Sequence, residues 1–335
     1  MDVLMACSEV VPIVKVGGLA DAVGALSKTL SRLGHNVTVA LPRYAMIDES
    51  GLMLARRLTQ LKFEAAGEEV VGAVFEGSLG SNVKLVLIDV PGQFEGDSVY
   101  GEEAGDDARN ATRFGQFCRA LASYINQRAG KGMPFDVVHA HDWPTALLPV
   151  MLRETKVRTV FTVHNAAHQG RFPLSALSSF GFVPDEHQRP MLAHDGRLNF
   201  LKAGVLSADV VGTVSSTYAR EIQTAEGGAG LDDVFRVRGE QLVGIVNGID
   251  YARWSPSTDP LLPARYDAED TANKGRCKAT LLRALSLPIK PDQPLLVALG
   301  RVCAQKGSDV LAASMAAMVA TGARVLVAGD GDEQM

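Results

Sequence analysis

Short apolar runs alternate along this chain with stretches in which apolar residues recur every three or four positions. The first run, residues 3–7, predicts a buried strand, and residues 37–41 predict a second one. Between them, apolar residues separated by steps of four and three predict one face of a helix, and Gly34 suits the left-handed position after its end. The residues of this face are Leu19, Val23, Leu26, Leu30 and Leu33. A strand, a helix and a strand in this order form a βαβ unit, which implies a parallel sheet.

The alternation continues toward the C-terminus with one exception. Residues 51–90 contain two β-rich runs, 70–75 and 83–90, with little helical pattern between them, which predicts a hairpin-like excursion. Further strands are expected at 137–141, 160–163, 210–213, 295–299 and 324–328. Further helices are expected at 113–125, 198–205, 217–222, 272–285 and 310–319.

A stretch rich in Pro and Ser, residues 254–260, interrupts this pattern and predicts a domain boundary. We expect an α/β fold with an N-terminal Rossmann-like domain at 1–253 and a hinge with a linker helix at 254–290. The start of a second Rossmann-like domain, incomplete in this chain, is expected at 291–335.

A glycine turn between the first strand and the first helix is the clearest candidate site. Gly17 and Gly18 allow backbone N–H groups to approach an anion, the helix N-terminus adds positive potential, and Lys15 adds a mobile charge. A phosphate-bearing ligand is the functional interpretation. The alternative is a tight turn with a solvated lysine, and the stretch matches neither G-x-G-x-x-G nor a P-loop.

Polar residues also follow two later strands. His141 and Asp142 end the strand at 137–141, and Asp142 is placed to accept hydrogen bonds from the first turn of the next helix. His164 and Asn165 end the strand at 160–163. Ligands of open α/β sheets bind at the carboxyl ends of the strands. The alternatives are a structural histidine and a capped strand end.

Two cations follow the first strand of the second block. Arg301 and Lys306 lie between the strand at 295–299 and a helix N-terminus, where they can bind a diphosphate. A solvated charged loop is the alternative. A polar loop at 92–110, which contains Tyr100, is long enough to be functional. No carboxylate in the sequence stands out as a general base.

Composition narrows the class of protein. The chain has 335 residues, 47% apolar and 21% charged, as in ordinary globular domains, and its net charge of -5 argues against a nucleic-acid partner. It contains no apolar run of membrane-spanning length and no N-terminal signal pattern. The four cysteines are scattered, which predicts neither a metal site nor a disulfide framework and favours a cytoplasmic location.

Several of these stretches together resemble bacterial glycogen synthases and plant starch synthases. The opening S-E-V-V-P, followed by K-V-G-G-L-A-D from Lys15 to Asp21, resembles the start of that family. The resemblance continues through H-A-H-D-W at 139–143, F-T-V-H-N at 161–165 with Gln169-Gly170, N-G-I-D at 247–250, and R-V-C-A-Q-K-G at 301–307. It extends over essentially the whole chain, with the motifs in family order.

The resemblance implies the GT-B fold, in which two Rossmann-like domains face a cleft. It implies glucosyl transfer from ADP-glucose to the non-reducing end of an α-1,4-glucan such as glycogen, with retention of configuration and without a metal or another cofactor. Lys15, Arg301 and Lys306 then match residues that bind the donor's phosphates, and His164 and Asn165 match residues that face the glucose. The implied catalytic residues are Lys15, His164, Arg301 and Lys306. The implied substrate-binding residues are Lys15, Gly17, Gly18, Asp21, Tyr100, His141, Asp142, Asn165, Gln169 and Asn247.

Two alternatives remain open. Family members continue well past the length of this chain, so a non-catalytic glucan-binding remnant is one, and a GT-B enzyme that uses UDP-glucose is the other. We expect residues 1–253 to be stable and the tail to be labile or self-associating, with negligible transferase activity for the isolated chain.

Overall fold

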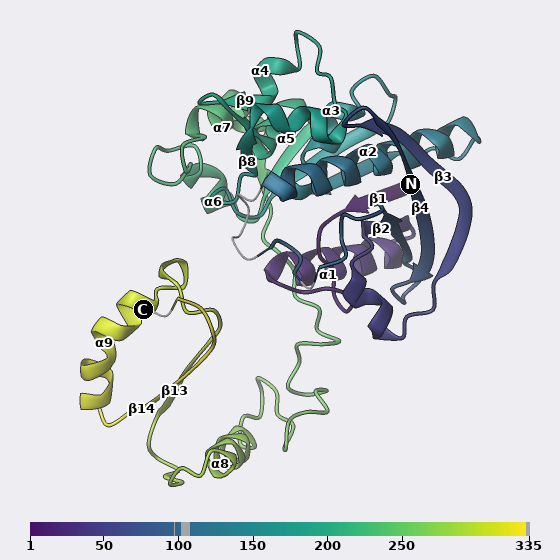
Figure 1. Cartoon of the computed structure of the whole chain (residues 1–335). Helices are drawn as coiled ribbons and strands as arrows, with labels where there is room; N and C mark the ends of the chain where they lie inside the picture. The colour runs from purple at the N-terminus through teal and green to yellow at the C-terminus, as the bar shows by residue number, and fades with distance from the viewer. Residues whose placement is uncertain (97, 102–107, 333–335) are drawn as a thin grey trace. The chain divides into compact units, whose positions relative to one another are not determined.

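A nine-stranded sheet forms the centre of the first of two compact units, Met1–Ile249 and Asp250–Met335 (Figure 1). The computed structural model of the chain describes residues 1–96, 98–101 and 108–332. Part of the polar loop predicted at 92–110 therefore lies outside the described residues, at 97 and 102–107. The first unit ends at Ile249, whereas the sequence predicted a domain end at 253.

The strand order of this sheet is β12-β11-β7-β6-β1-β2-β5-β4-β3. Its strands are β1 (Asp2–Ala6), β2 (Asn36–Pro42), β3 (Ala55–Ala65), β4 (Glu68–Ser78), β5 (Lys84–Asp89), β6 (Val137–His141), β7 (Arg158–Val163), β11 (Val210–Thr213) and β12 (Leu242–Gly244). The pairs from β12 to β5 are parallel, and β4 pairs antiparallel with β5 and β3. The expected parallel sheet and the hairpin-like excursion are both confirmed.

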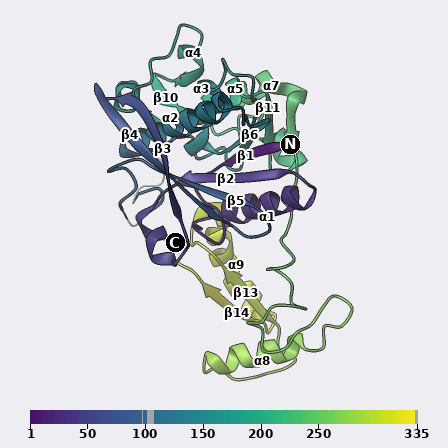
Figure 2. The same ribbon diagram turned by 90° about the vertical axis from the view of Figure 1, so that its right-hand side faces the viewer.

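The sequence did not predict β3. Its first residues alternate poorly, and only Leu61, Phe63 and Ala65 are buried, because β3 is the edge strand of the sheet. The long strands β3 and β4 run along this edge (Figure 2). The central strand β1 differs, since Leu4, Met5 and Ala6 are fully buried, as expected for a parallel strand covered on both faces.

Helix α1 (Gly18–Arg32) packs against β2, and Gly34 beyond its end has a φ of 89°, as predicted. The buried face of α1 differs from the predicted one. Leu26 and Leu33 are exposed, whereas Ala20, Gly24 and Ser27 join Leu19 and Val23 in the interior. Small residues are needed there because a Cβ on Gly24 would lie 2.7 Å from Val11 Cγ2.

The remaining helices of the first unit include α2 (Ala108–Gly130), α3 (Leu147–Met151) and α5 (Phe200–Ser207), which pack side by side on the sheet face opposite α1 (Figure 1). Between them lies a chain of edge-to-face aromatic contacts, Phe94–Phe114, Phe114–Trp143 and Trp143–Phe172, with ring centroids 5.0–5.8 Å apart. Trp143 lies two residues beyond β6, so these contacts anchor the segment that follows this strand.

Smaller elements complete the first unit. A separate antiparallel sheet has the order β8-β10-β9, from Arg171–Pro173, Arg197–Asn199 and Ala193–His194. The short helices are η1 (Ala45–Ser50), η2 (Trp143–Thr145), η3 (Leu174–Phe180), α4 (Arg189–Leu192), α6 (Ser216–Glu221), α7 (Asp232–Arg238) and η4 (Gly239–Gln241).

The second unit contains α8 (Lys274–Ala284), β13 (Leu295–Leu299), η5 (Ala304–Lys306), α9 (Ser308–Ala320) and β14 (Arg324–Ala328). These elements match the predicted ones, and β13 pairs parallel with β14. Their apolar faces are largely uncovered: Leu296, Val297 and Leu299 are exposed, and α9 has no buried residue.

Candidate active site

The carboxyl ends of β1, β6 and β7 bring polar residues of the first unit together, among them the predicted His141, Asp142 and His164. These strands are neighbours in the sheet, so the residues that follow them lie along one edge. Ser8 and Glu9 follow β1, His141 and Asp142 lie at the end of β6, and His164 follows β7. Open parallel sheets bind their ligands at this edge.

Three histidines form a continuous row across β6 and β7. The rings of His139 and His141 are 4.0 Å apart, and His141 Nδ1 lies 3.1 Å from His164 Nε2, so that one of these two nitrogens donates to the other. His139 Nε2 lies 2.7 Å from Thr162 Oγ1. His164, at the end of the row, is therefore oriented by its buried neighbour His141.

Burial keeps these imidazoles neutral at pH 7. It lowers the pKa of His164 to about 4 and that of His139 to about 3, and it lowers the pKa of His141 well below its usual value. His141 Nε2 is buried without a hydrogen-bond partner among the residues the structure describes. Neutral rings can donate to or accept from sugar hydroxyl groups without adding a positive charge to the site.

Asp142 has a different role from the predicted one. Its side chain makes no cap to the helical turn that follows, so the predicted cap is wrong. Instead, Oδ1 accepts hydrogen bonds from the backbone N–H of His164, at 2.6 Å, and of Asn165, at 3.4 Å. The reason is local: Asp142 has a φ of 56°, which is unusual for a residue other than glycine and directs its carboxylate across to the end of β7.

The electrostatic environment of Asp142 is also unusual. Burial raises the pKa of its carboxyl group from 3.8 to about 7, against the lowering effect of the two backbone N–H donors. Shifted pKa values concentrate at functional sites. Asp142 thus holds the loop that carries His164, and its charge state changes near neutral pH.

Glu9 is a site residue that the sequence analysis did not single out. Its buried carboxylate accepts hydrogen bonds from the backbone N–H groups of Val16 and Gly17, at 2.6 and 2.7 Å, and from the Tyr100 hydroxyl at 2.9 Å. The N–H of Gly17, which the sequence analysis offered to a ligand anion, is thus occupied by Glu9. The sequence signal that could have identified Glu9 is its position, since it is an acidic residue shortly after a buried strand.

The glycine turn joins β1 to α1, as the sequence predicted. Gly17 is the residue before α1, whose first turn receives no side-chain cap, and Gly18 has open space where a Cβ would lie. Lys15 Nζ lies 2.6 Å from Asp21 Oδ2 in the first turn of α1. The second oxygen of Asp21, Oδ1, is buried and has no hydrogen-bond partner among the described residues. A cation and an open helix N-terminus therefore lie side by side.

Tyr100 ties this edge to α2. Its hydroxyl group contacts both Glu9 and Ser8, at 2.9 and 2.7 Å, and its carbonyl oxygen accepts from Asn110 Nδ2. Burial raises the pKa of the Tyr100 phenol well above its usual value, so the phenol stays protonated and can donate to Glu9.

The other predicted residues of the first unit lie in different settings. Asn165 Oδ1 accepts from the backbone N–H of Ala167. Gln169 is buried, with its amide bound to Asn199 and to the carbonyl oxygen of Ala229, so its hydrogen bonds serve the fold. Asn247 is exposed beyond β12.

Arg301 and Lys306 belong to the second unit. Both are exposed on the segment that joins β13 to α9, and α9 begins after Gly307 without a side-chain cap. The two cations therefore precede a helix N-terminus that has no side-chain cap.

Two further observations concern the described part of the chain. No group of three or more His, Cys, Asp or Glu side chains gathers there in a way that could hold a metal ion. None of its helices is both long enough and apolar enough to span a membrane.

Comparison with known proteins identifies similar chains. Residues 2–237 match the family model described as the starch synthase catalytic domain. The glycogen synthase of Geotalea uraniireducens (strain Rf4) is 38% identical over 344 residues, covering 100% of this chain and 70% of that protein. The glycogen synthase of Thioalkalivibrio sulfidiphilus (strain HL-EbGR7) is 40% identical over 339 residues, covering 99% of this chain and 70% of that protein.

A solved structure is also similar. It is the catalytic domain of starch synthase IV from Arabidopsis thaliana, bound to ADP and acarbose, with 30% identity and a TM-score of 0.89 over 99% of this chain and 69% of that one. The similarity confirms the expected α/β fold of the GT-B class. The family predicted from the sequence motifs is confirmed as well, and the chain belongs to the starch synthase catalytic domain family of glycosyltransferases, which also includes bacterial glycogen synthases.

Proposed function

We propose that this protein transfers glucose from ADP-glucose to the non-reducing end of an α-1,4-glucan, with retention of anomeric configuration. The observation that carries the proposal is the row of neutral histidines that ends in His164, at the same sheet edge as the Lys15 glycine turn. Family membership supplies the class of reaction, and the named relatives make glycogen or starch.

The electrostatics of the edge suit such a transfer. Departure of a nucleoside diphosphate leaves positive charge on the sugar ring, and a protonated imidazole beside it would oppose that charge. His164, with its pKa lowered to about 4, is neutral at pH 7. The carboxylate of Glu9 acts on His164 electrostatically and places negative charge near the same edge. His164 would hydrogen-bond the glucose and contact the reacting group.

The leaving diphosphate needs positive charge. In the first unit, Lys15 and the uncapped N-terminus of α1 provide it. In the second unit, Arg301 and Lys306 precede the uncapped N-terminus of α9. We assign the donor's phosphates to these three cations.

Binding of the donor tests the proposal without depending on turnover. Saturation-transfer NMR gives the Kd of ADP-glucose. Lys15→Gln should raise this Kd, at most by about ten- to a hundredfold, because one charge-assisted phosphate contact is lost and the pair with Asp21 is no longer given up for it. Lys28→Gln is the matched control, because it removes a lysine of α1 that lies about 15 Å beyond the start of the helix.

Competition with UDP-glucose completes the experiment. We expect ADP-glucose to displace UDP-glucose from the protein, and UDP-glucose to displace ADP-glucose poorly. An unchanged ADP-glucose affinity in Lys15→Gln would reject the phosphate assignment. A preference for UDP-glucose would reject the proposed donor.

A further inference from the structure

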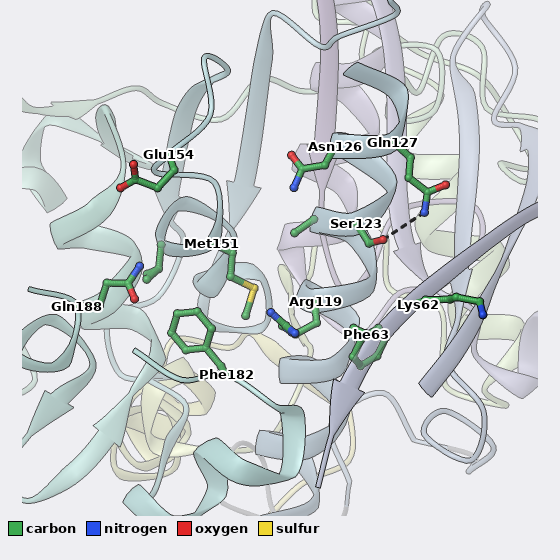
Figure 3. A pocket seen from close by; sticks show the side chains of 12 residues that line it. Lys62, Phe63, Arg119, Ser123, Asn126, Gln127, Met151, Glu154, Phe182 and Gln188 are labelled. Carbon is green, nitrogen blue, oxygen red and sulfur yellow. Dashed lines mark hydrogen bonds between the residues drawn. The ribbon is translucent and has the colours of Figure 1, made fainter. Parts of the chain in front are cut away.

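A pocket of about 530 Å³ lies in the first unit, among β3, α2, α3 and the segment that contains Phe182 and Gln188 (Figure 3). Its residues on α2, from Arg119 to Gln127, begin 11 positions after the start of the helix at Ala108. At 1.5 Å per residue they lie about 17–28 Å along the helix. The helix begins near Tyr100, so this pocket is separate from the active-site edge.

Arg119 points into this pocket between Phe63 and Phe182, with Met151 beside it (Figure 3). Its guanidinium carbon lies 5.9 Å from the centre of the Phe63 ring. Its Nε atom is buried and has no hydrogen-bond partner among the described residues, and no ion pair joins Arg119 to a carboxylate of that part of the chain. An arginine held among apolar side chains without such a partner loses hydration and recovers little for it.

The charges around Arg119 do not compensate for the hydration that its guanidinium group loses on burial. Burial lowers the pKa of the guanidinium group, and the Glu64 carboxylate, the charge that acts on it most, raises it again only in part. Glu64 is exposed, as is Glu154 at the rim of the pocket. The other cation of the lining, Lys62, lies 3.5 Å from Glu69 in an exposed pair.

The polar lining is rich in hydrogen-bond donors. Gln188 uses Oε1 to accept from the backbone N–H of Asp185, which leaves its amide NH₂ group for the pocket. The Asn126 amide, from α2, makes no hydrogen bond within the described chain and also lines the pocket. Donors around a half-buried arginine, over apolar walls from Phe63, Phe182 and Met151, form a site for an anion with an apolar body.

We propose that this pocket binds a small organic molecule that carries a carboxylate or phosphate group, with the anionic group held by Arg119. The planar guanidinium group binds either oxyanion through two parallel N–H···O bonds, and Nε–H is one of the two donors that this geometry uses. The apolar part of the ligand packs against Phe182 and Met151. This site is independent of donor binding, because none of its lining residues belongs to the glycine turn or to the row of histidines.

The test uses the whole chain, labelled with ¹⁵N at arginine, and two probes, inorganic phosphate and citrate. The Nε–H signal of Arg119, assigned by its loss in Arg119→Lys, should shift in a saturable way with at least one probe. Calorimetry should show the same binding event. Arg119→Met should weaken it by at least about tenfold.

Matched variants distinguish binding at Arg119 from binding elsewhere on the protein. Arg128→Met removes another arginine of α2 that also stacks on a ring, Phe135 at 4.4 Å, but lies outside the pocket, and it should leave the event unchanged. Lys15→Gln should also leave it unchanged, since donor-site phosphate binding depends on Lys15. Gln188→Leu should weaken it if Arg119→Met fails to fold.

The outcomes are distinct. Binding of citrate alone identifies a carboxylate ligand, and binding of phosphate alone identifies a phosphate ligand. No saturable shift of the Arg119 signal with either probe would overturn the proposal. Equal affinities in the parent protein and in both Arg119→Met and Gln188→Leu would overturn it as well.

Discussion

Replacing Asp142 by asparagine should stabilise the protein at neutral and alkaline pH but not in acid. Asparagine keeps the Oδ1 atom that accepts the N–H of His164 at 2.6 Å, so the hydrogen bond is preserved while the charge is removed. Any pH-dependent difference between the two proteins then reports the cost of ionising Asp142 in its partly buried position.

The magnitude follows from the pKa. Burial raises the pKa of Asp142 from 3.8 to about 7. Between these values the unfolded chain is ionised and the folded chain is not, so the unfolded state binds fewer protons and stability falls as pH rises. About three pKa units at 1.36 kcal/mol each give up to about 4 kcal/mol. This is an upper limit, because the side chain is not wholly shielded from water.

The assay is denaturant unfolding at several pH values, followed by Trp143 fluorescence. The chain has two tryptophans, and Trp254→Phe leaves Trp143, which is 3% exposed in the core of the first unit. The free energy of unfolding of the parent, minus that of Asp142→Asn, should be constant below about pH 4, fall through pH 4–7 and level off above.

The two proteins must be compared by subtraction, because buried histidines also make the free energy of unfolding depend on pH. The lowered pKa values of His139, about 3, and His164, about 4, remove stability as pH falls below 6.5, which opposes the effect of Asp142. Both proteins contain these histidines, so the subtraction cancels them. Asp209→Asn is a matched control of opposite sign. Burial raises the pKa of Asp209, but the hydrogen bonds from Thr159 and the charge of Arg158 together outweigh burial and lower it. A difference curve for Asp142→Asn that is flat, or that rises with pH, would refute the reasoning.

Three further predictions concern the site and the chain. In a version extended to the full length of its relatives, His164→Ala should lower the single-turnover rate of glucose transfer by more than about tenfold while ADP-glucose affinity changes by less than about threefold, and equal rates would make His164 a structural residue. Glu9→Gln should weaken ADP-glucose binding by about three- to tenfold, measured by NMR titration, because the N–H groups of Val16 and Gly17 lose a charged acceptor and the turn loosens. Trypsin should cut first after Arg253 and Arg265, which are exposed in a stretch without helix or strand between β12 and α8, and mass spectrometry showing early cuts within the first unit would contradict this.

The sequence predicted those helices and strands whose burial is visible in their own pattern of apolar and small residues. The strand at 3–7 and the glycine turn were found because a parallel strand is continuously apolar and a turn before a helix needs small residues. The edge strand β3 was missed, because most of its first residues are exposed and do not alternate between apolar and polar. The predicted buried face of α1 was wrong, because the helix approaches Val11 closely and needs small residues there. A pattern of large apolar residues does not reveal such positions.

The candidate site was predictable where its residues follow neighbouring strands. It was not predictable where contacts join residues that are far apart in the sequence. His141 and His164 follow adjacent strands, so their shared edge could be inferred from strand ends alone. The contact of Glu9 with Tyr100 joins residues 91 positions apart, and the row from His139 to His164 depends on strand register. The pocket around Arg119 combines residues from 62 to 188, and no local spacing connects them.

The pairing of Lys15 with Asp21 bears on how the donor is bound. At 2.6 Å the two groups already neutralise each other, and Glu9 occupies the N–H of Gly17. A diphosphate that binds the first unit must therefore replace Asp21 as the partner of Lys15, and Asp21 then needs other donors in the first turn of α1. The net gain from Lys15 is smaller than that of an uncompensated lysine, because one ion pair is exchanged for another.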